Sequence, residues 1–97
     1  MKYEIQFVPS ADKDLDHYEA RDQRIILDAI ARFLWFDANV ESRRRKRLRR
    51  DSLAPWELRI RDYRVFYEVA GEGLVRVLAV GHKRHNELFI RGQRVKI

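Results

Sequence analysis

Polar and apolar residues alternate at the start of this chain and then take on helical spacing. Residues 2–8 alternate with a period of two, which predicts a β-strand that Pro9 ends. Residues 11–20 carry a thin apolar stripe with Ser10 as the expected N-cap, so they predict a short helix at the surface. Residues 22–37 repeat apolar side chains on one broad face, which predicts a stronger helix that needs a sheet to pack on.

The period returns to two in the second half of the chain. Residues 56–61 and 63–69 alternate as two strands joined at a tight corner. The glycine-containing segment 70–73 predicts a hairpin turn, and the nearly continuous apolar run 75–80 is typical of a central strand. The chain then leaves through a polar exit segment, residues 82–89. Residues 87–91 fit either a strand or a helical turn, and Gly92 ends them before a basic tail.

This order of elements predicts an α+β domain: an N-terminal strand, a helical hairpin, and then a three- to four-stranded, mostly antiparallel meander. The helical hairpin is expected to cover one face of the sheet, and the arginine-bearing face is expected to stay open. With 97 residues, the chain has the length of one compact domain with a modest core, so a single domain spanning residues 1–97 is expected.

Charge is divided unevenly between the two halves of the chain. Residues 1–40 hold 5 lysines and arginines against 8 acidic residues, whereas residues 41–97 hold 16 against 7, so the net charge of +6 conceals a strongly basic half. Such an asymmetry is typical of a polyanion binder, or of a protein that an acidic partner neutralises. The basic connector at residues 43–50 is expected to dock on RNA phosphates or on a protein partner. Its candidate RNA-binding residues are Arg44, Arg45, Lys46, Arg47, Arg49 and Arg50.

The sequence contains no cysteine, which excludes a disulfide framework and suits a reducing cytoplasm. No apolar segment is long enough for a membrane span or for the core of a signal peptide, so the expected location is cytoplasmic, without membrane contact. His82 and His85 lie three residues apart but lack acidic or thiol partners, so neither a metal site nor any other cofactor is expected.

Strand alternation places Glu57, Arg59 and Arg61 on one face of the predicted sheet. Further basic or titratable side chains expected nearby, from the next two strands, are Arg64, His82, Lys83, Arg84 and His85. Together these side chains are expected to form one concave basic patch. The plainer interpretation of this strand is a solvated face on which Glu57 is the counter-ion of neighbouring arginines.

RNA cleavage without a metal needs a base for the 2′-hydroxyl proton, cations for the phosphorane and an acid for the leaving 5′-oxygen. Glu57 or a histidine can serve as the base, and His82 or His85 can act as base or acid because imidazole titrates near neutrality. Arginine suits the phosphate because its planar fork binds two oxygens at once. Aromatic rings that can stack on an unpaired base, or pack in the core instead, are Tyr63, Phe66 and Phe89.

Two segments resemble a known family. Residues 53–67 read LAPWELRIRDYRVFY and resemble the central signature of RelE-type toxins, and residues 77–84 read VLAVGHKR and resemble the last core strand of that family with its basic exit. Because the preceding strand and helical hairpin also come in the same order, the resemblance to the RelE/ParE toxin superfamily covers nearly the whole chain.

The resemblance implies a toxin of a toxin–antitoxin pair that acts as a ribosome-dependent, metal-independent endoribonuclease, cleaves mRNA and inhibits translation. The implied partners are the ribosome with its mRNA and a cognate antitoxin, which the basic half leads us to expect to be acidic and amphipathic. ParE-type members of the same superfamily also resemble this chain. They imply the alternative, a toxin that inhibits DNA gyrase by binding it.

Positions carried over from the family define an expected catalytic set. Arg59 matches a basic residue of the family's catalytic strand, Arg64 matches the phosphate-binding arginine, and Lys83 or Arg84 matches the basic residue of the exit strand. Glu57 stands where RelE itself has a basic residue.

The main departure from the family is Phe89, which stands where RelE carries a tyrosine. Its ring keeps a stacking surface but has no hydroxyl for proton transfer. That step is therefore expected to fall to His82, His85 or Glu57.

Overall fold

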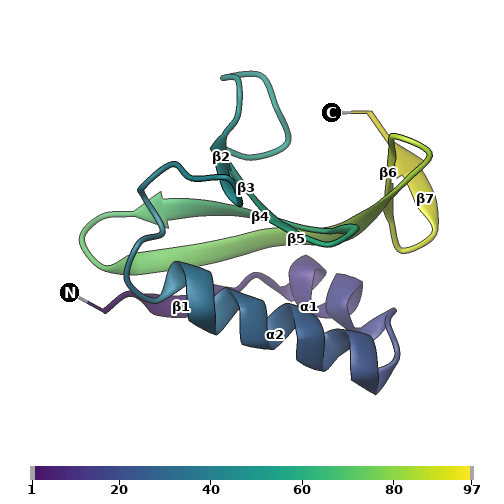
Figure 1. Ribbon diagram of the computed structural model, residues 1–97, viewed down its shortest axis with the longest axis horizontal. Helices are drawn as coiled ribbons and strands as arrows, with labels where there is room; N and C mark the ends of the chain where they lie inside the picture. The colour runs from purple at the N-terminus through teal and green to yellow at the C-terminus, as the bar shows by residue number, and fades with distance from the viewer. Residues whose placement is uncertain (1, 97) are drawn as a thin grey trace.

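The computed structural model describes residues 2–96, which form one curved sheet with two helices packed on the same face (Figure 1). The elements in chain order are β1 (Glu4–Phe7), α1 (Pro9–Asp16), α2 (Ala20–Leu34), β2 (Arg45–Arg47), β3 (Trp56–Ile60), β4 (Tyr63–Ala70), β5 (Leu74–Arg84), β6 (Glu87–Ile90) and β7 (Gln93–Val95). Strands β2 to β7 follow one another in antiparallel order, while β1 pairs in parallel with β5. The predicted α+β class is confirmed, with a longer meander than expected.

The differences in element bounds have local causes. Helix α1 begins at Pro9, whose fixed backbone angle suits the first helical position, so the predicted cap at Ser10 is wrong: Val8 is the N-cap and gives no side-chain hydrogen bond. The basic connector contains a short edge strand, β2, which pairs with β3. The polar exit and the basic tail form the hairpin of β6 and β7, because positive-φ residues at Asn86, Arg91 and Gly92 allow tight turns.

The main core lies between the helices and the sheet. Its buried members from α2 are Ile26, Ala29, Ile30 and Leu34, and those from the sheet include Leu58, Val65, Tyr67, Val75, Val77 and Val80. Tyr67 is fully buried, and its hydroxyl donates a 2.7 Å hydrogen bond to the carbonyl of Ala38, which satisfies its polar group. Neither helix within residues 2–96 has the length and apolar character to cross a membrane.

A smaller core lies on the other face, so the expectation that this face stays fully open is wrong. Its buried residues are Ala54, Phe66, Ala79 and Leu88. The loop between β2 and β3 and the β6–β7 hairpin both rise on this side, away from the helices (Figure 1). Gly81 permits the close approach of β6, since a Cβ built there would lie 2.4 Å from the carbonyl oxygen of Phe89.

Strand β5 is central and contains a β-bulge. Phe66 pairs with Ala79 and Tyr67 with Val77, so Leu78 has no partner on β4. The extra residue shifts the alternation of side chains: Val77 and Val80 both belong to the main core, although three positions separate them.

Asp14 of α1 joins the helices to the sheet edge between β1 and β6. Its carboxylate is 2% exposed, accepts the Val80 amide at 3.1 Å through Oδ2, and lies 2.9 Å from Nε of Arg91 through Oδ1. A helix predicted to lie at the surface thus contributes a buried acid that satisfies a backbone donor of β5 and holds the C-terminal hairpin.

We expect Asp14→Ala to lower the free energy of unfolding by about 2 kcal/mol, because the buried Val80 amide loses its acceptor. Urea denaturation followed by tryptophan fluorescence measures this change. Asp16→Ala, at an exposed position of the same helix, is the control and should stay within about 0.5 kcal/mol of the parent protein. Equal free energies of unfolding for the Asp14 and Asp16 variants would show that the contacts of Asp14 do not stabilise the fold.

Candidate functional site

Three cationic side chains gather on the face of the sheet opposite the helices. Arg59 of β3 lies directly across from Arg64 of β4, which lies across from Gly81 of β5, and Lys83 comes two residues after that glycine on the same face. They line a pocket of about 460 Å³, here called the basic pocket, whose residues are Arg59, Asp62, Arg64, Lys83, His85 and Asn86. Strand pairing therefore brings together much of the predicted cluster.

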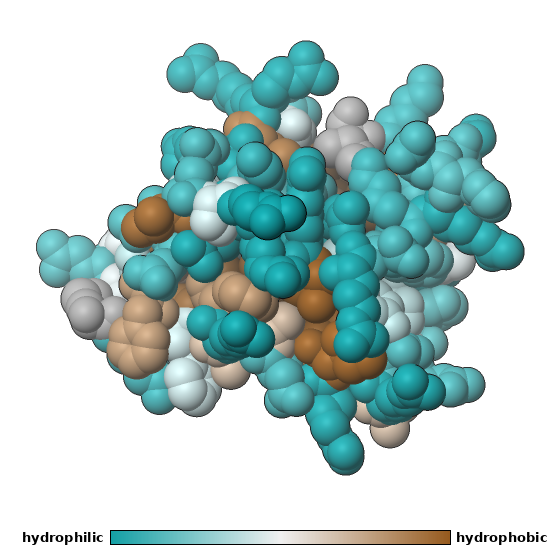
Figure 2. Space-filling view, viewed as in Figure 1, coloured by the Kyte–Doolittle hydropathy of each residue, from teal (hydrophilic) through white to brown (hydrophobic). Residues whose placement is uncertain are grey.

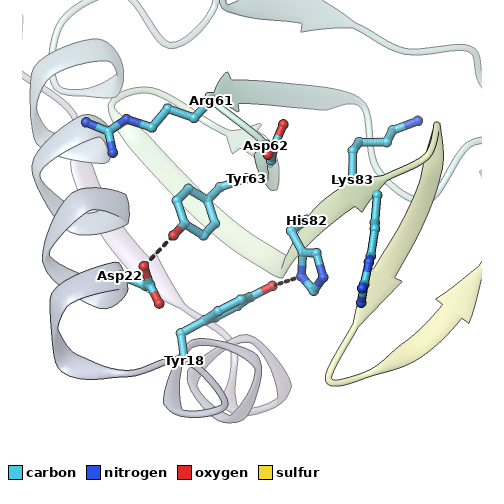
Figure 3. Close-up of a pocket in the computed structure, with 8 residues that line it drawn as sticks. Tyr18, Asp22, Arg61, Asp62, Tyr63, His82 and Lys83 are labelled. Atoms are coloured by element: carbon cyan, nitrogen blue, oxygen red, sulfur yellow. Dashed lines mark hydrogen bonds between the residues drawn. The ribbon is translucent and has the colours of Figure 1, made fainter.

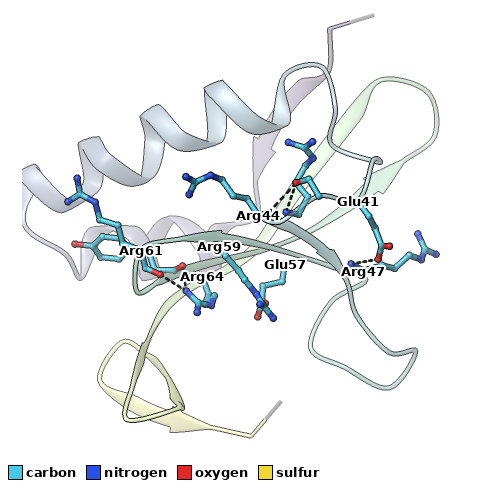
Figure 4. A network of polar contacts seen from close by, with 10 residues as sticks. Glu41, Arg44, Arg47, Glu57, Arg59, Arg61 and Arg64 are labelled. Carbon is cyan, nitrogen blue, oxygen red and sulfur yellow. Dashed lines mark hydrogen bonds and ion pairs between the residues drawn. The ribbon is translucent and has the colours of Figure 1, made fainter.

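Glu57 holds Arg59 in place. Its carboxylate is 2% exposed and accepts a 2.7 Å charge-assisted hydrogen bond from Nε of Arg59, whose side chain is 47% exposed (Figure 4). Glu57 was expected on an open surface, and that expectation is wrong because Arg59 covers it. A carboxylate committed to an arginine and closed off from solvent suits a positioning role, with the outer side of the guanidinium left for an anion.

Arg64 is fixed by backbone carbonyls. Its Nη1 donates 2.9 Å hydrogen bonds to the carbonyls of Arg61 and Tyr63, while its Nε is buried without an acceptor among residues 2–96. Burial lowers the pKa of Arg64 from its ordinary value, and the nearby Arg59 lowers it further, while Glu57 opposes the shift. An unsatisfied buried donor costs stability, so a functional reason for this arginine is needed.

Alternation predicted that Arg61 shares a strand face with Glu57 and Arg59, and this prediction is wrong. Arg61 lies in the turn after β3 with a φ of 53°, outside the pleat. Its side chain nevertheless contributes to a second basic depression of about 410 Å³, lined by Arg43, Arg44, Arg59, Arg61 and Arg64. Since Arg59 and Arg64 line both depressions, the positive surface is continuous from the basic pocket to residues just before β2.

His82 lies on the helix side of the sheet, not in the basic pocket, so the predicted convergence of all these residues is wrong. Its Nδ1 lies 2.7 Å from the hydroxyl of Tyr18 (Figure 3). Its ring stacks on Phe89 with ring centroids 5.8 Å apart. Burial lowers the pKa of His82, with further lowering from the charges of His17 and Arg84. Phe89 is thereby placed beside His82, away from Arg59 and Arg64 of the basic pocket.

A second pocket of about 420 Å³ surrounds His82, here called the tyrosine pocket, lined by Tyr18, Asp22, Arg61, Asp62, Tyr63, His82, Lys83 and Arg84. The hydroxyl of Tyr63 donates a 2.5 Å hydrogen bond to Asp22 of α2. Burial, together with that hydrogen bond, raises the pKa of Tyr63 to about 12, and burial also raises the pKa of Tyr18. Tyr18 and Asp22 were not predicted as members of this pocket. The sequence relates them only by a spacing of four residues across the junction of two helices.

The basic run 43–50 divides into side chains with different surroundings. The guanidinium of Arg45 donates to the carbonyls of Phe33 and Val40, at 3.2 and 2.7 Å, and so satisfies groups at the end of α2. Arg47 lies over the ring of Trp56. Exposed residues of the run are Arg43, Arg44, Lys46, Arg47, Arg49 and Arg50. The space-filling view shows hydrophilic side chains over much of the molecule, including the loop above β2 (Figure 2).

Comparisons with known proteins identify a family and a solved structure with a similar fold. A family model described as the ParE toxin of the type II toxin–antitoxin system, parDE, matches residues 5–87. The crystal structure of the toxin–antitoxin complex RelBE2 from Mycobacterium tuberculosis contains a chain that superposes with a TM-score of 0.68 at 24% identity, covering 86% of this chain and 100% of that one. No curated protein matches the sequence significantly.

Proposed function

This chain belongs to the family of ParE toxins of type II toxin–antitoxin systems. Starting from a toxin of such a system, we propose, on the residues of its basic pocket, that it is a ribosome-dependent, metal-independent endoribonuclease that cleaves mRNA and stops translation. The observation that supports the proposal is the basic pocket, where Arg59, Arg64 and Lys83 meet His85. Cations and a group able to transfer protons are the components that such a cleavage needs.

In the proposed reaction the 2′-hydroxyl of the RNA attacks the adjacent phosphorus. His85 takes the proton from that hydroxyl while the new O–P bond forms, and Arg59 and Arg64 stabilise the dianionic phosphorane. The bond from phosphorus to the 5′-oxygen then breaks, and the ammonium of Lys83 gives the leaving oxygen its proton. The products are a 2′,3′-cyclic phosphate and a 5′-hydroxyl.

Other predicted catalytic residues receive different roles in this proposal. Glu57 positions Arg59 through their 2.7 Å contact and takes no proton. His82 and Arg84 belong to the tyrosine pocket, on the other side of the sheet. Phe89 supports His82 by stacking, so its missing hydroxyl does not affect proton transfer in the basic pocket.

A cognate antitoxin is the proposed protein partner. The toxin–antitoxin complex that this chain resembles supports it, and so does the exposed apolar surface. Large apolar side chains exposed on and after α2 are Leu27, Trp35, Phe36 and Val40. An acidic, amphipathic antitoxin segment would cover such apolar side chains and neutralise the basic half.

Inhibition of DNA gyrase by direct binding is the second candidate function, which the match to the ParE family favours. One experiment distinguishes the two candidate functions. Inducing the toxin in cells should stop protein synthesis and produce discrete cuts in ribosome-bound mRNA, mapped by primer extension. Intact mRNA together with loss of gyrase supercoiling by the purified toxin would replace the ribonuclease proposal with the gyrase one.

A further inference from the structure

The tyrosine pocket lies against the basic pocket and has no role in the proposed cleavage. The two pockets share Asp62 and Lys83 as lining residues, so a ligand can occupy both by passing the turn between β3 and β4, where Asp62 lies. The tyrosine pocket lies between the helices and the sheet (Figure 3), and Arg59 and Arg64 of the basic pocket extend from the sheet on the side away from α2 (Figure 4). Their contiguity suggests one extended ligand with two chemically different parts.

Aromatic rings form the walls of the tyrosine pocket. Tyr18 makes edge-to-face contacts with Tyr63 and His82, with ring centroids 5.7 Å apart in both cases. The hydrogen bonds from Tyr63 to Asp22 and between Tyr18 and His82 fix these rings, and Phe89 supports the far side of the histidine. Rings held in this way offer stacking faces that lose little conformational freedom when a planar group binds.

The charges around the pocket indicate which part of a ligand enters. Asp22 lines this pocket and not the basic pocket, so its carboxylate repels a phosphate here, while Asp62 lies where the two pockets meet. Positive charge for a neighbouring phosphate comes from Arg61, Lys83 and Arg84. The volume of about 420 Å³ is within the range of pockets for small planar ligands. Carboxylates accept hydrogen bonds, so they favour a ring edge that presents N–H groups.

We propose that the tyrosine pocket receives one nucleobase of a single-stranded RNA whose adjacent phosphate lies in the basic pocket. This inference rests on the proposed ribonuclease function and names its substrate-recognition site. Bases with an exocyclic amino group fit the carboxylates better than uracil, so the pocket gives the toxin a base preference next to the scissile phosphate.

Binding of short RNA to the full chain tests this proposal. The probes are fluorescent tetranucleotides with 2′-O-methyl riboses, which cannot be cleaved, in versions that carry one abasic residue at each position. Loss of the base at one position should weaken binding by roughly 10-fold, while loss at other positions matters less. In Tyr63→Leu the same abasic change should not weaken RNA binding further. Tyr63→Phe keeps the ring, so it should retain the roughly 10-fold effect on binding.

The control separates this inference from the ribonuclease function. Arg64→Ala should weaken binding of the full and abasic tetranucleotides equally, because it removes a phosphate contact and leaves the base pocket intact. If no abasic position affects binding to the unmodified protein, the base pocket is wrong even where mRNA cleavage is observed.

Discussion

Replacing Arg64 with alanine is expected to reduce mRNA cleavage by about 100- to 1,000-fold and to abolish toxicity, because it removes a fixed cation from the developing phosphorane. The guanidinium is already held by two backbone carbonyls at 2.9 Å, so it needs no rearrangement when the substrate arrives. The loss should lie in the rate of cleavage more than in ribosome binding, since other arginines surround the pocket.

Cleavage of a defined mRNA on purified ribosomes measures this effect, at a toxin concentration that saturates the ribosomes. Arg76→Ala is the matched control, since Arg76 is a partly exposed arginine of β5 that pairs with Glu68 and lines neither pocket described above. It should cleave at the parent rate. An Arg64→Ala variant that folds, as circular dichroism would show, and still cleaves at full rate would remove the basic pocket from the mechanism.

Much of the fold followed from the hydrophobic pattern because strand and helix periods are local properties of the chain. Alternation in residues 56–69 correctly placed Arg59 and Arg64 on the same face, because β3 and β4 form an uninterrupted antiparallel pair. Short edge strands were missed because their signal is weak. Strand β2, for example, consists of three basic residues, and pairing with β3 rather than composition makes it a strand.

The placement of His82 could not be read from alternation because of the bulge in β5. Without the extra residue Leu78, His82 would lie on the arginine face and Lys83 on the helix face. The bulge exchanges them, so Lys83 joins the arginines and His82 joins Tyr18. A single unpaired residue thus decides which of Lys83 and His82 lies on the same face as Arg59 and Arg64.

Glu57 illustrates a different limit of sequence reasoning. Its position on the strand was predicted correctly, but its burial depends on the Arg59 side chain folding back over it. A neighbour-by-neighbour pattern describes which face a residue occupies and not what covers that face. The tyrosine pocket was missed for the same reason, because Asp22 and Tyr63 come from α2 and β4, far apart in the sequence.

The two histidines provide the second test, because the sheet separates them. His85→Asn is expected to slow cleavage by about 100- to 10,000-fold, since the amide cannot accept the 2′-hydroxyl proton. Asparagine suits this position because residue 85 has a φ of 52°, which asparagine tolerates better than most residues. His82→Asn is the matched control and should cleave at the parent rate when toxin is saturating, although more toxin will be needed if the base pocket is weakened.

Single-turnover cleavage on programmed ribosomes distinguishes the two sides of the sheet. Slow cleavage by the His85 variant alone would assign proton transfer to the basic pocket, where His85 stands with Arg59, Arg64 and Lys83. The opposite pattern, with only the His82 variant slow at saturating toxin, would move the reaction to the tyrosine pocket and make its two carboxylates part of the catalytic surroundings. Because the bulge at Leu78 places His82 on the helix side of the sheet, the same measurement decides which of the two faces carries the reaction.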